Sequence, residues 1–199
     1  SVGSTAIALL LAVSSAQAVP IELITNGEFE NPDIGGSAWS LEASVPGWYN
    51  SSGSLELWSQ GAYGSPTTGT DGAVTGQHHE IPNDSDGNLT VTSDPVAAAI
   101  GMVDLSFDAW NRMATGISYT IMGAGSRVVA NGQHTFIGSE WEAVSVMGLA
   151  VAAGETLIVS FQSIGGGGSG AHIDQVSLMY TQDAVVPEPA IIALFGLGL

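Results

Sequence analysis

The amino-acid sequence predicts an all-β fold, a jelly-roll β-sandwich with apolar signal segments at both termini. No stretch keeps a capped apolar period of 3.6 residues, which an amphipathic helix needs. The chain of 199 residues contains 27 glycines and many Ser, Thr and Val residues. Its short apolar runs alternate with turn residues at the spacing typical of a sandwich or jelly roll.

The strands follow from this alternation. In residues 102–110, Val103 and Leu105 fall on one side and Asp104 and Asp108 on the other, which predicts a half-buried strand. Asn131-Gly132 is a strong hairpin signal and predicts a turn between two strands. The expected strands are 21–25, 41–49 with a Pro46-Gly47 turn inside it, 54–58, 73–81, 89–93, 102–110, 117–122, 127–130, 133–137, 141–149, 156–163 and 172–180.

The two ends of the chain differ from the central part. Thr5–Val13 is apolar and leads to Ala16-Gln17-Ala18, the pattern of a signal-peptide cleavage site, so we expect export. We expect a signal peptide at 1–18, one jelly-roll domain at 19–183 and an apolar sorting segment at 184–199. Because Ser1 follows neither Met nor a basic region, and the final apolar run is shorter than the roughly 20 residues of a membrane span, we expect both segments to be truncated.

Charge and cysteine content exclude several classes. With 19 acidic residues, two Arg and no Lys, the net charge is −17, so phosphate backbones would be repelled and nucleic acid is not an expected partner. The acidic surface fits either solubility in a saline or calcium-rich medium or carboxylates that hold Ca²⁺. There is no Cys, so stability must come from the core, with or without a metal ion.

A first resemblance concerns the C-terminal segment. Val186-Pro187-Glu188-Pro189 followed by an Ala/Leu/Gly-rich run resembles the PEP-CTERM sorting signal of Gram-negative bacteria, in which the motif precedes a membrane helix and a short Arg-rich tail. The resemblance implies processing by an exosortase-type enzyme, transient inner-membrane association through this segment, and a final place at the cell surface or in the extracellular matrix. The basic tail is missing here, and a Pro-rich linker to an ordinary anchor helix is the alternative.

A second resemblance covers the central domain. Three segments resemble the galactose-binding-like jelly-roll domains, which include many carbohydrate-binding modules and the DUF642-like proteins: Leu23-Ile-Thr-Asn-Gly-Glu-Phe-Glu30, Val45-Pro-Gly-Trp48 and Ala171-His-Ile-Asp-Gln-Val-Ser-Leu178. Residues 54–58, 76–80 and 110–112 resemble the middle strands of the DUF642-like and PEP-CTERM members. The resemblance implies a domain that binds polysaccharide or exopolysaccharide.

The same resemblance implies a structural calcium ion. The first and last strands of a jelly roll can lie close, and two carboxylates brought together there would repel each other unless a hard cation joined them. The implied ligands are Glu30, Asp174, the carbonyl of Glu28 and Glu56. Alternatively, Glu30 accepts backbone N–H bonds from a turn and Asp174 faces water. Asp84–Asn88 also contains calcium-type side chains, but without the downstream Glu of an EF-hand it is predicted to be a turn.

A sugar-binding surface needs an aromatic platform beside hydrogen-bonding groups. Phe29 and Trp48 are expected in the core, and Arg112 could instead pair with Asp104 or Asp108. Trp39 and Tyr49 lie beside turns and are further aromatic candidates. The candidate ligand-binding residues are Trp58, Tyr63, Gln77, His78, His79, Glu80 and Arg112.

The histidines do not form a metal motif. Adjacent residues on a strand point to opposite faces, so His78 pairs with Glu80, and Gln77 with His79, and either pair could hydrogen-bond sugar hydroxyls. His134 and His172 have no neighbour at ligand spacing, which argues against zinc.

The predicted function is therefore non-catalytic carbohydrate binding by an exported surface or matrix protein. The alternatives are a structural or adhesive surface protein without a sugar site and, remotely, a glycan-active enzyme. No motif pairs two carboxylates, and the sequence has no Gly-x-Ser-x-Gly elbow, no Cys nucleophile and no phosphate loop.

Overall fold

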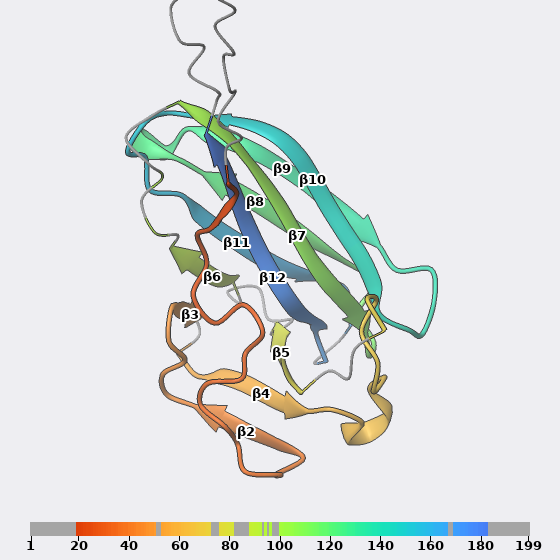
Figure 1. Cartoon of the computed structure of the whole chain (residues 1–199). Helices are drawn as coiled ribbons and strands as arrows, with labels where there is room; N and C mark the ends of the chain where they lie inside the picture. Colours follow the sequence, from red (N-terminus) through yellow and green to blue (C-terminus); the bar gives the residue numbers. More distant parts are fainter. Residues whose placement is uncertain are drawn as a thin grey trace, which may run out of the picture.

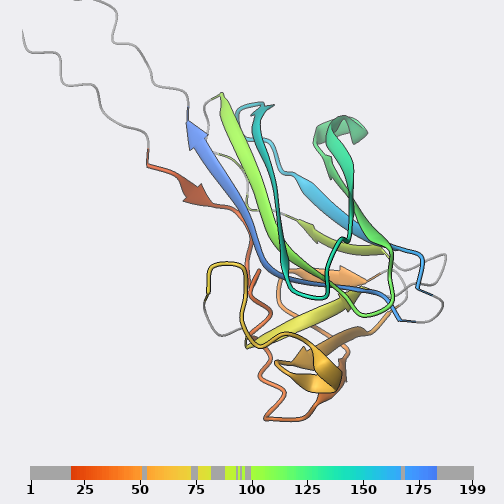
Figure 2. The same ribbon diagram turned by 90° about the vertical axis from the view of Figure 1, so that its right-hand side faces the viewer.

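The computed structural model describes residues 19–50, 53–72, 76–81, 88–92, 94, 96, 100–166 and 169–182. Within them the chain forms two antiparallel sheets that face each other, which confirms the all-β jelly-roll prediction (Figures 1 and 2). In this part of the chain, no helix has the length and apolar character to span a membrane. The predicted segments 1–18 and 184–199 and residues 84–87 of the predicted turn lie outside the described residues.

The first sheet carries the candidate site. Its strand order is β10 (Glu142–Val151), β7 (Gly101–Asn111), β12 (Ala171–Gln182), β5 (Gln77–Ile81), β4 (Leu55–Ser59) and β2 (Trp39–Glu42), and β1 (Ile21–Glu22) also pairs with β12. The second sheet runs β3 (Trp48–Asn50), β6 (Asn88–Thr92), β11 (Ile158–Ile164), β8 (Gly116–Met122) and β9 (Val128–Thr135). Two single 3₁₀ turns, η1 (Ala62–Gly64) and η2 (Ala124–Ser126), interrupt the loops.

The core lies between the sheets and follows the alternation of the strands. Val103, Leu105 and Phe107 of β7 are buried as predicted, and they meet the second sheet, where the rings of Phe107 and Phe161 lie 5.0 Å apart. Phe29 and Trp48 are core residues, also as predicted, with ring centroids 4.6 Å apart. Burial of such side chains stabilises each by about 1.5–3 kcal/mol relative to exposure, which lets a chain without disulfides hold this fold.

The predicted hairpin at Asn131-Gly132 is wrong, because β9 runs unbroken through both residues. Gly132 pairs with Tyr119 of β8, and a Cβ at Gly132 would lie 2.2 Å from the Tyr119 hydroxyl oxygen. The glycine therefore makes room for a ring on the neighbouring strand. The expected strand 41–49 is also divided: β2 ends at Glu42, Gly47 adopts a φ of 82°, and β3 joins the other sheet.

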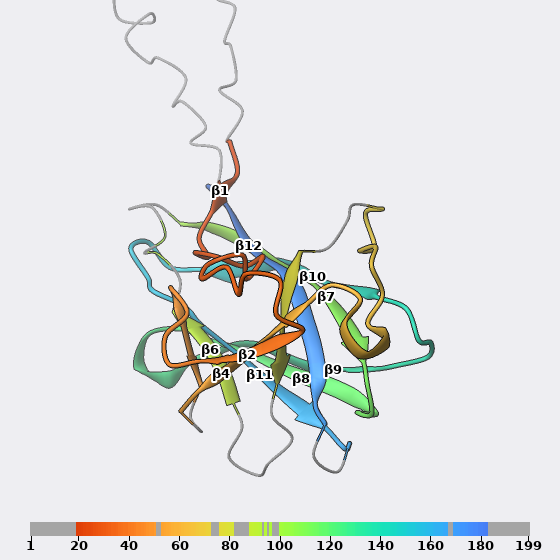
Figure 3. The same cartoon turned by 90° about the horizontal axis from the view of Figure 1, so that it is seen from below.

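The last strand, β12, organises the first sheet. β7 pairs along one edge, while the other edge is shared by β5, next to residues 171–173, and β1, next to residues 179 and 180 (Figure 3). Between them, the segment after β1 bonds directly to β12: the Val176 N–H donates to the Gly27 carbonyl at 2.9 Å, opposite a bulge in which Gln175 has a φ of 52°. The start and end of the domain are thus held together, as expected from the sequence.

Replacing Gly27 should destabilise this junction. In Gly27→Ala, the new Cβ would lie 1.8 Å from the Val176 carbonyl oxygen, so the two segments would have to separate, at a cost of about 1–3 kcal/mol. Urea unfolding followed by tryptophan fluorescence measures the loss. Gly138→Ala is the control, because its Cβ would come no closer than 3.7 Å to Glu142 and should change the unfolding free energy little. Equal midpoints for the two variants would contradict the close approach.

Candidate functional site

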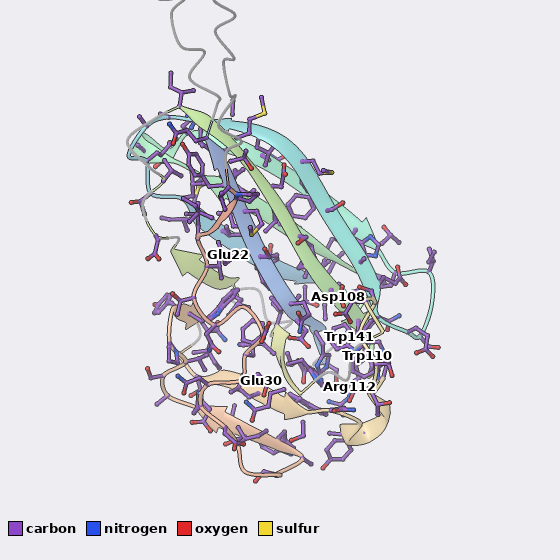
Figure 4. The ribbon with its side chains drawn as sticks, in the orientation of Figure 1. Glu22, Glu30, Asp108, Trp110, Arg112 and Trp141 are labelled. Carbon is purple, nitrogen blue, oxygen red and sulfur yellow. The ribbon has the colours of Figure 1, made fainter. Side chains whose placement is uncertain are left out.

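The outer face of the first sheet carries a buried aromatic cluster at the end where β7 finishes. Because Trp58 pairs with His78 and His172 pairs with Trp110, strand register gathers side chains that are distant in sequence. Trp141, just before β10, joins them (Figure 4). The rings of His78 and His172 lie 5.1 Å apart, those of Trp110 and His172 4.7 Å apart, and those of His78 and Trp141 5.3 Å apart.

Residues 60–72, which follow β4, pack against this cluster. The Trp141 indole N–H donates to the Pro66 carbonyl at 3.3 Å. Thr70 donates from its backbone N–H and its hydroxyl to the two carboxylate oxygens of Asp108, at 2.9 and 2.6 Å. The segment is therefore tied down at two points, and the aromatic side chains beneath it are nearly inaccessible to water.

Burial keeps the imidazoles of the cluster neutral. It lowers the pKa of His78 to about 3, and it lowers the pKa of His172 well below its usual value, with the nearby histidines and Arg112 adding to the effect. The ring nitrogens of both are buried without a hydrogen-bond partner among the described residues. His78, a predicted ligand-binding residue, thus lies beneath the surface. The contact with His172 was missed because strand register, and not sequence spacing, creates it.

A partly exposed group of side chains lies over the edge of this cluster. The Arg112 guanidinium carbon is 4.6 Å from the centroid of the Trp58 ring and 5.7 Å from that of Tyr63, whose side chain is 66% exposed. The Trp58 indole N–H donates to the Glu56 carboxylate at 3.1 Å. We call Trp58, Tyr63 and Arg112 the platform. The predicted ligand-binding residue Trp58 is only 2% exposed beneath Arg112, so Tyr63 and Arg112 supply the exposed surface. Trp39, 44% exposed, pairs with Trp58 from β2 and extends the same face.

Glu80 connects the platform to the loop before β12. One of its carboxylate oxygens accepts the Gly170 N–H at 2.6 Å, and the other lies 3.7 Å from Arg112 and 3.8 Å from His172. Burial, with a contribution from Glu56, raises the pKa of Glu80. Arg112 therefore pairs with Glu80, and not with Asp104 or Asp108, whose carboxylates accept bonds from Gly148 and Thr70.

Gln77 and His79 lie on the opposite face of β5, away from the platform. The Gln77 amide donates to the carbonyls of Phe29 and Pro32, both at 2.8 Å, and so holds the loop after the first strand. His79 is buried beside the Phe29 ring, and burial lowers its pKa to about 3. The alternation rule separated these residues from His78 and Glu80 correctly, but their contacts are with the protein interior.

Three of the four predicted calcium residues lie near one another beside the β12 bulge: Glu28 and Glu30 line an acidic hollow, and both act electrostatically on Asp174. Asp174 is 1% exposed, its Oδ2 has no partner among the described residues, and its Oδ1 accepts the Gln175 N–H at 2.8 Å. Burial first, then the carboxylates of Glu30, Asp108 and Glu28, raises its pKa to about 8. The hollow of about 400 Å³ is lined by Glu22, Ile24, Asn26, Gly27, Glu28, Glu30, Gln175, Val176 and Ser177 (Figure 4 labels Glu22 and Glu30).

The alternatives for these carboxylates are resolved in part. Asp174 does not face water, so that alternative is wrong. Glu30 accepts a backbone N–H, but from Gln77 of β5, at 2.7 Å. Glu56 lies elsewhere, on β4 opposite Glu80. Among the described residues, no three His, Asp or Glu side chains form a group able to hold a metal ion.

Strand register also creates two carboxylate pairs that the sequence does not reveal, Asp108 with Asp174 and Glu56 with Glu80. Glycoside hydrolysis needs two carboxyl groups that flank a bound substrate. Asp108, Asp174 and Glu80 are at most 5% exposed, so neither pair presents two carboxyl groups to a substrate.

Comparison with solved structures relates the fold to carbohydrate-binding modules. A family 61 module solved with β-1,4-galactotriose matches with a TM-score of 0.50 at 14% identity, over 79% of this chain and 97% of the module. A family 35 module from Clostridium thermocellum gives 0.42 at 15% identity, over 82% and 98% of the two chains. An arabinose-bound α-L-arabinofuranosidase gives 0.46 at 13% identity, over 80% of this chain but 26% of the enzyme. At these identities the likeness concerns the fold. No family model and no curated protein matches the sequence.

The buried imidazoles predict acid sensitivity. The pKa of His78 is about 3 in the folded state against 6.5 for the unfolded chain. The contribution of the neutral imidazole to the free energy of unfolding is therefore complete above pH 6.5 and is lost as the pH falls toward 3. As the pH falls from 6.5 to 4.5, protonation of this group in the unfolded chain should lower the free energy of unfolding by roughly 2–3 kcal/mol. In His78→Phe, which keeps a ring but removes the titration, the unfolding free energy in urea should fall less over that interval. The same fall in both proteins would contradict a neutral buried His78.

Proposed function

We propose that this protein binds carbohydrate, without catalysing a reaction, at the platform of Trp58, Tyr63 and Arg112. The arrangement of Arg112 carries the proposal. Its guanidinium is held against the Trp58 ring beside the exposed Tyr63 ring, so an apolar ring and a plane of N–H donors share one surface. A pyranose presents apolar C–H faces and hydroxyl groups, and this combination of surfaces is what such a ligand requires.

The wider setting supports a polysaccharide ligand. The similar module was solved with β-1,4-galactotriose, and Tyr63 of the platform is 66% exposed. With the export and sorting segments expected from the sequence, we infer a protein that holds polysaccharide or exopolysaccharide at the surface or in the matrix of a Gram-negative bacterium. An exosortase-type enzyme would process it after transient inner-membrane association.

We also propose a structural Ca²⁺ at the acidic hollow, held by Asp174, Glu30 and the carbonyl of Glu28. The unpartnered, buried Oδ2 of Asp174 supports this, because a buried carboxylate oxygen without a partner is costly unless a cation or proton satisfies it. Ca²⁺ takes six to eight oxygen ligands, so backbone carbonyls and water would supply the rest. Glu56, which lies beside Trp58 and Glu80, is not in the proposed set.

Removing the exposed ring of the platform should weaken binding strongly. In Tyr63→Ala, the lost contact area corresponds to about 1.5–3 kcal/mol, or at least about tenfold in affinity. Affinity electrophoresis through gels containing different polysaccharides measures retention. Tyr49→Ala is the matched control, because Tyr49 is similarly exposed, at 64%, but lies on β3 of the other sheet.

Equal losses in the two tyrosine variants would show that the platform is not the binding site. If no polysaccharide retains the protein and it self-associates instead, the structural or adhesive alternative holds.

Calcium should raise the melting temperature, because a ligand that binds the native state stabilises it. Millimolar Ca²⁺ is expected to stabilise the unaltered protein relative to EDTA, whereas Asp174→Asn should not respond. Asp33→Asn, at an exposed carboxylate outside the hollow, serves as the control and should respond normally. An unaltered protein with the same melting temperature in calcium and EDTA would contradict the site.

Asp174 also gives the calcium experiment a second readout. Since its pKa is raised from 3.8 to about 8, its stabilisation in EDTA is complete below pH 3.8 and is lost as the pH rises through 8. In EDTA, Asp174→Asn should therefore gain stability relative to the unaltered protein as the pH rises over this interval.

A further inference from the structure

We propose that the platform selects neutral sugars over acidic ones, a specificity that rests on the carbohydrate binding proposed above. The platform contains a cation, which by itself would attract a sugar carboxylate or sulfate. The groups around Arg112 cancel that attraction, and they leave a surface suited to uncharged hydroxyl groups.

Two carboxylates accompany the single cation. Glu80 has an oxygen 3.7 Å from the Arg112 guanidinium, and Glu56 accepts the N–H of the indole ring that Arg112 covers. With both carboxylates ionised, the three side chains carry a net charge of −1. If Glu80 holds its proton, the sum is zero. The platform is not positive in either state.

The rest of the chain supplies no positive charge that would make the platform positive. The second cation, Arg127, is held by both carboxylate oxygens of Glu155, at 2.9 and 2.7 Å, and the chain as a whole carries −17. Exposed charges act over about 8 Å at physiological ionic strength, so the groups of the platform itself decide the specificity. A carboxylate at the same distance from an acidic ligand as the guanidinium repels it as strongly as the guanidinium attracts it, so one ionised carboxylate is enough to offset one guanidinium.

Hydrogen bonding favours a neutral ligand as well. At 3.7 Å the Arg112–Glu80 contact is an ion pair without a hydrogen bond, and no described residue accepts a hydrogen bond from Arg112. Its N–H groups can therefore donate to hydroxyl oxygens of a sugar. Glu56 can accept from hydroxyl groups through its second oxygen. A hydroxyl group donates and accepts, so it can serve both residues, whereas a carboxylate ligand only accepts.

The experiment compares matched ligands by isothermal titration calorimetry in calcium-containing buffer. The probes are neutral trisaccharides of glucose, galactose and mannose, each paired with a counterpart whose C6 groups are oxidised to carboxylates. Only binding that Tyr63→Ala weakens is assigned to the platform, which excludes calcium bridges elsewhere on the acidic surface. The neutral member of a pair should bind at least tenfold more tightly, and the ratio should narrow at high salt.

The Glu56→Gln variant tests whether the negative charge of Glu56, and not the shape of its side chain, causes the selectivity. The amide keeps an acceptor for the Trp58 indole N–H but removes the negative charge, so the neutral-to-acidic ratio should fall severalfold. Asp104→Asn is the matched control, because it removes one charge from β7 at a position eight residues from Arg112, roughly 26 Å away along an extended strand. This control should keep the ratio of the unaltered protein.

Two results would overturn the proposal. If an oxidised trisaccharide binds the platform as tightly as its neutral counterpart or more tightly, the selectivity is wrong while carbohydrate binding stands. If no trisaccharide of either kind binds, the proposed function fails and the selectivity fails with it.

Discussion

The pairing of β12 is the interaction on which the rest of the structure depends. β7 covers one edge of this strand, and β5, the Gly27 segment and β1 share the other. This arrangement lets a single strand serve both candidate sites. His172 packs beneath the platform with Trp58 and Trp110. Asp174, two residues later on the same face, is near enough to Glu28 and Glu30 of the acidic hollow for their charges to raise its pKa, in addition to burial. A change in the register of β12 would displace both together.

The buried polar groups show where this fold gives up stability. A buried group without a hydrogen bond costs about 1–3 kcal/mol, and unpartnered atoms occur on His78, His79, His172 and Asp174. The imidazoles limit the cost by remaining neutral and packing as rings. Asp174 can also remain neutral by holding its proton, because burial and the neighbouring carboxylates of Glu30 and Asp108 raise its pKa to about 8, but its Oδ2 still has no partner among the described residues. The demand for a cation or a proton is therefore concentrated at one atom of the structure.

The local sequence pattern predicts burial and sheet face correctly for residues whose environment depends only on the alternation of side chains along a strand. Val103 and Phe107 are buried as predicted, and the division of His78 and His79 between two faces is confirmed. Local sequence does not determine which strands pair or in which register, so the contact of His78 with His172 could not be predicted. Gly132 shows a second limit: Asn-Gly is compatible both with a tight turn and with space for a ring on the next strand, and Tyr119 decides between them.

An acidic chain that binds neutral polysaccharide would use shape and repetition in place of electrostatic attraction. Without steering, association with a neutral polymer would proceed at the ordinary 10⁵–10⁷ M⁻¹s⁻¹ of specific encounters, and the stacked rings would set the dissociation rate. On the proposed function, one platform with a single exposed ring would give modest affinity. Several molecules gathered at a cell surface would bind the repeating units of one polymer together, and retention would then come from effective concentration. On the proposed function, the charge of −17 would keep these protein molecules from binding one another while each binds the same polysaccharide chain.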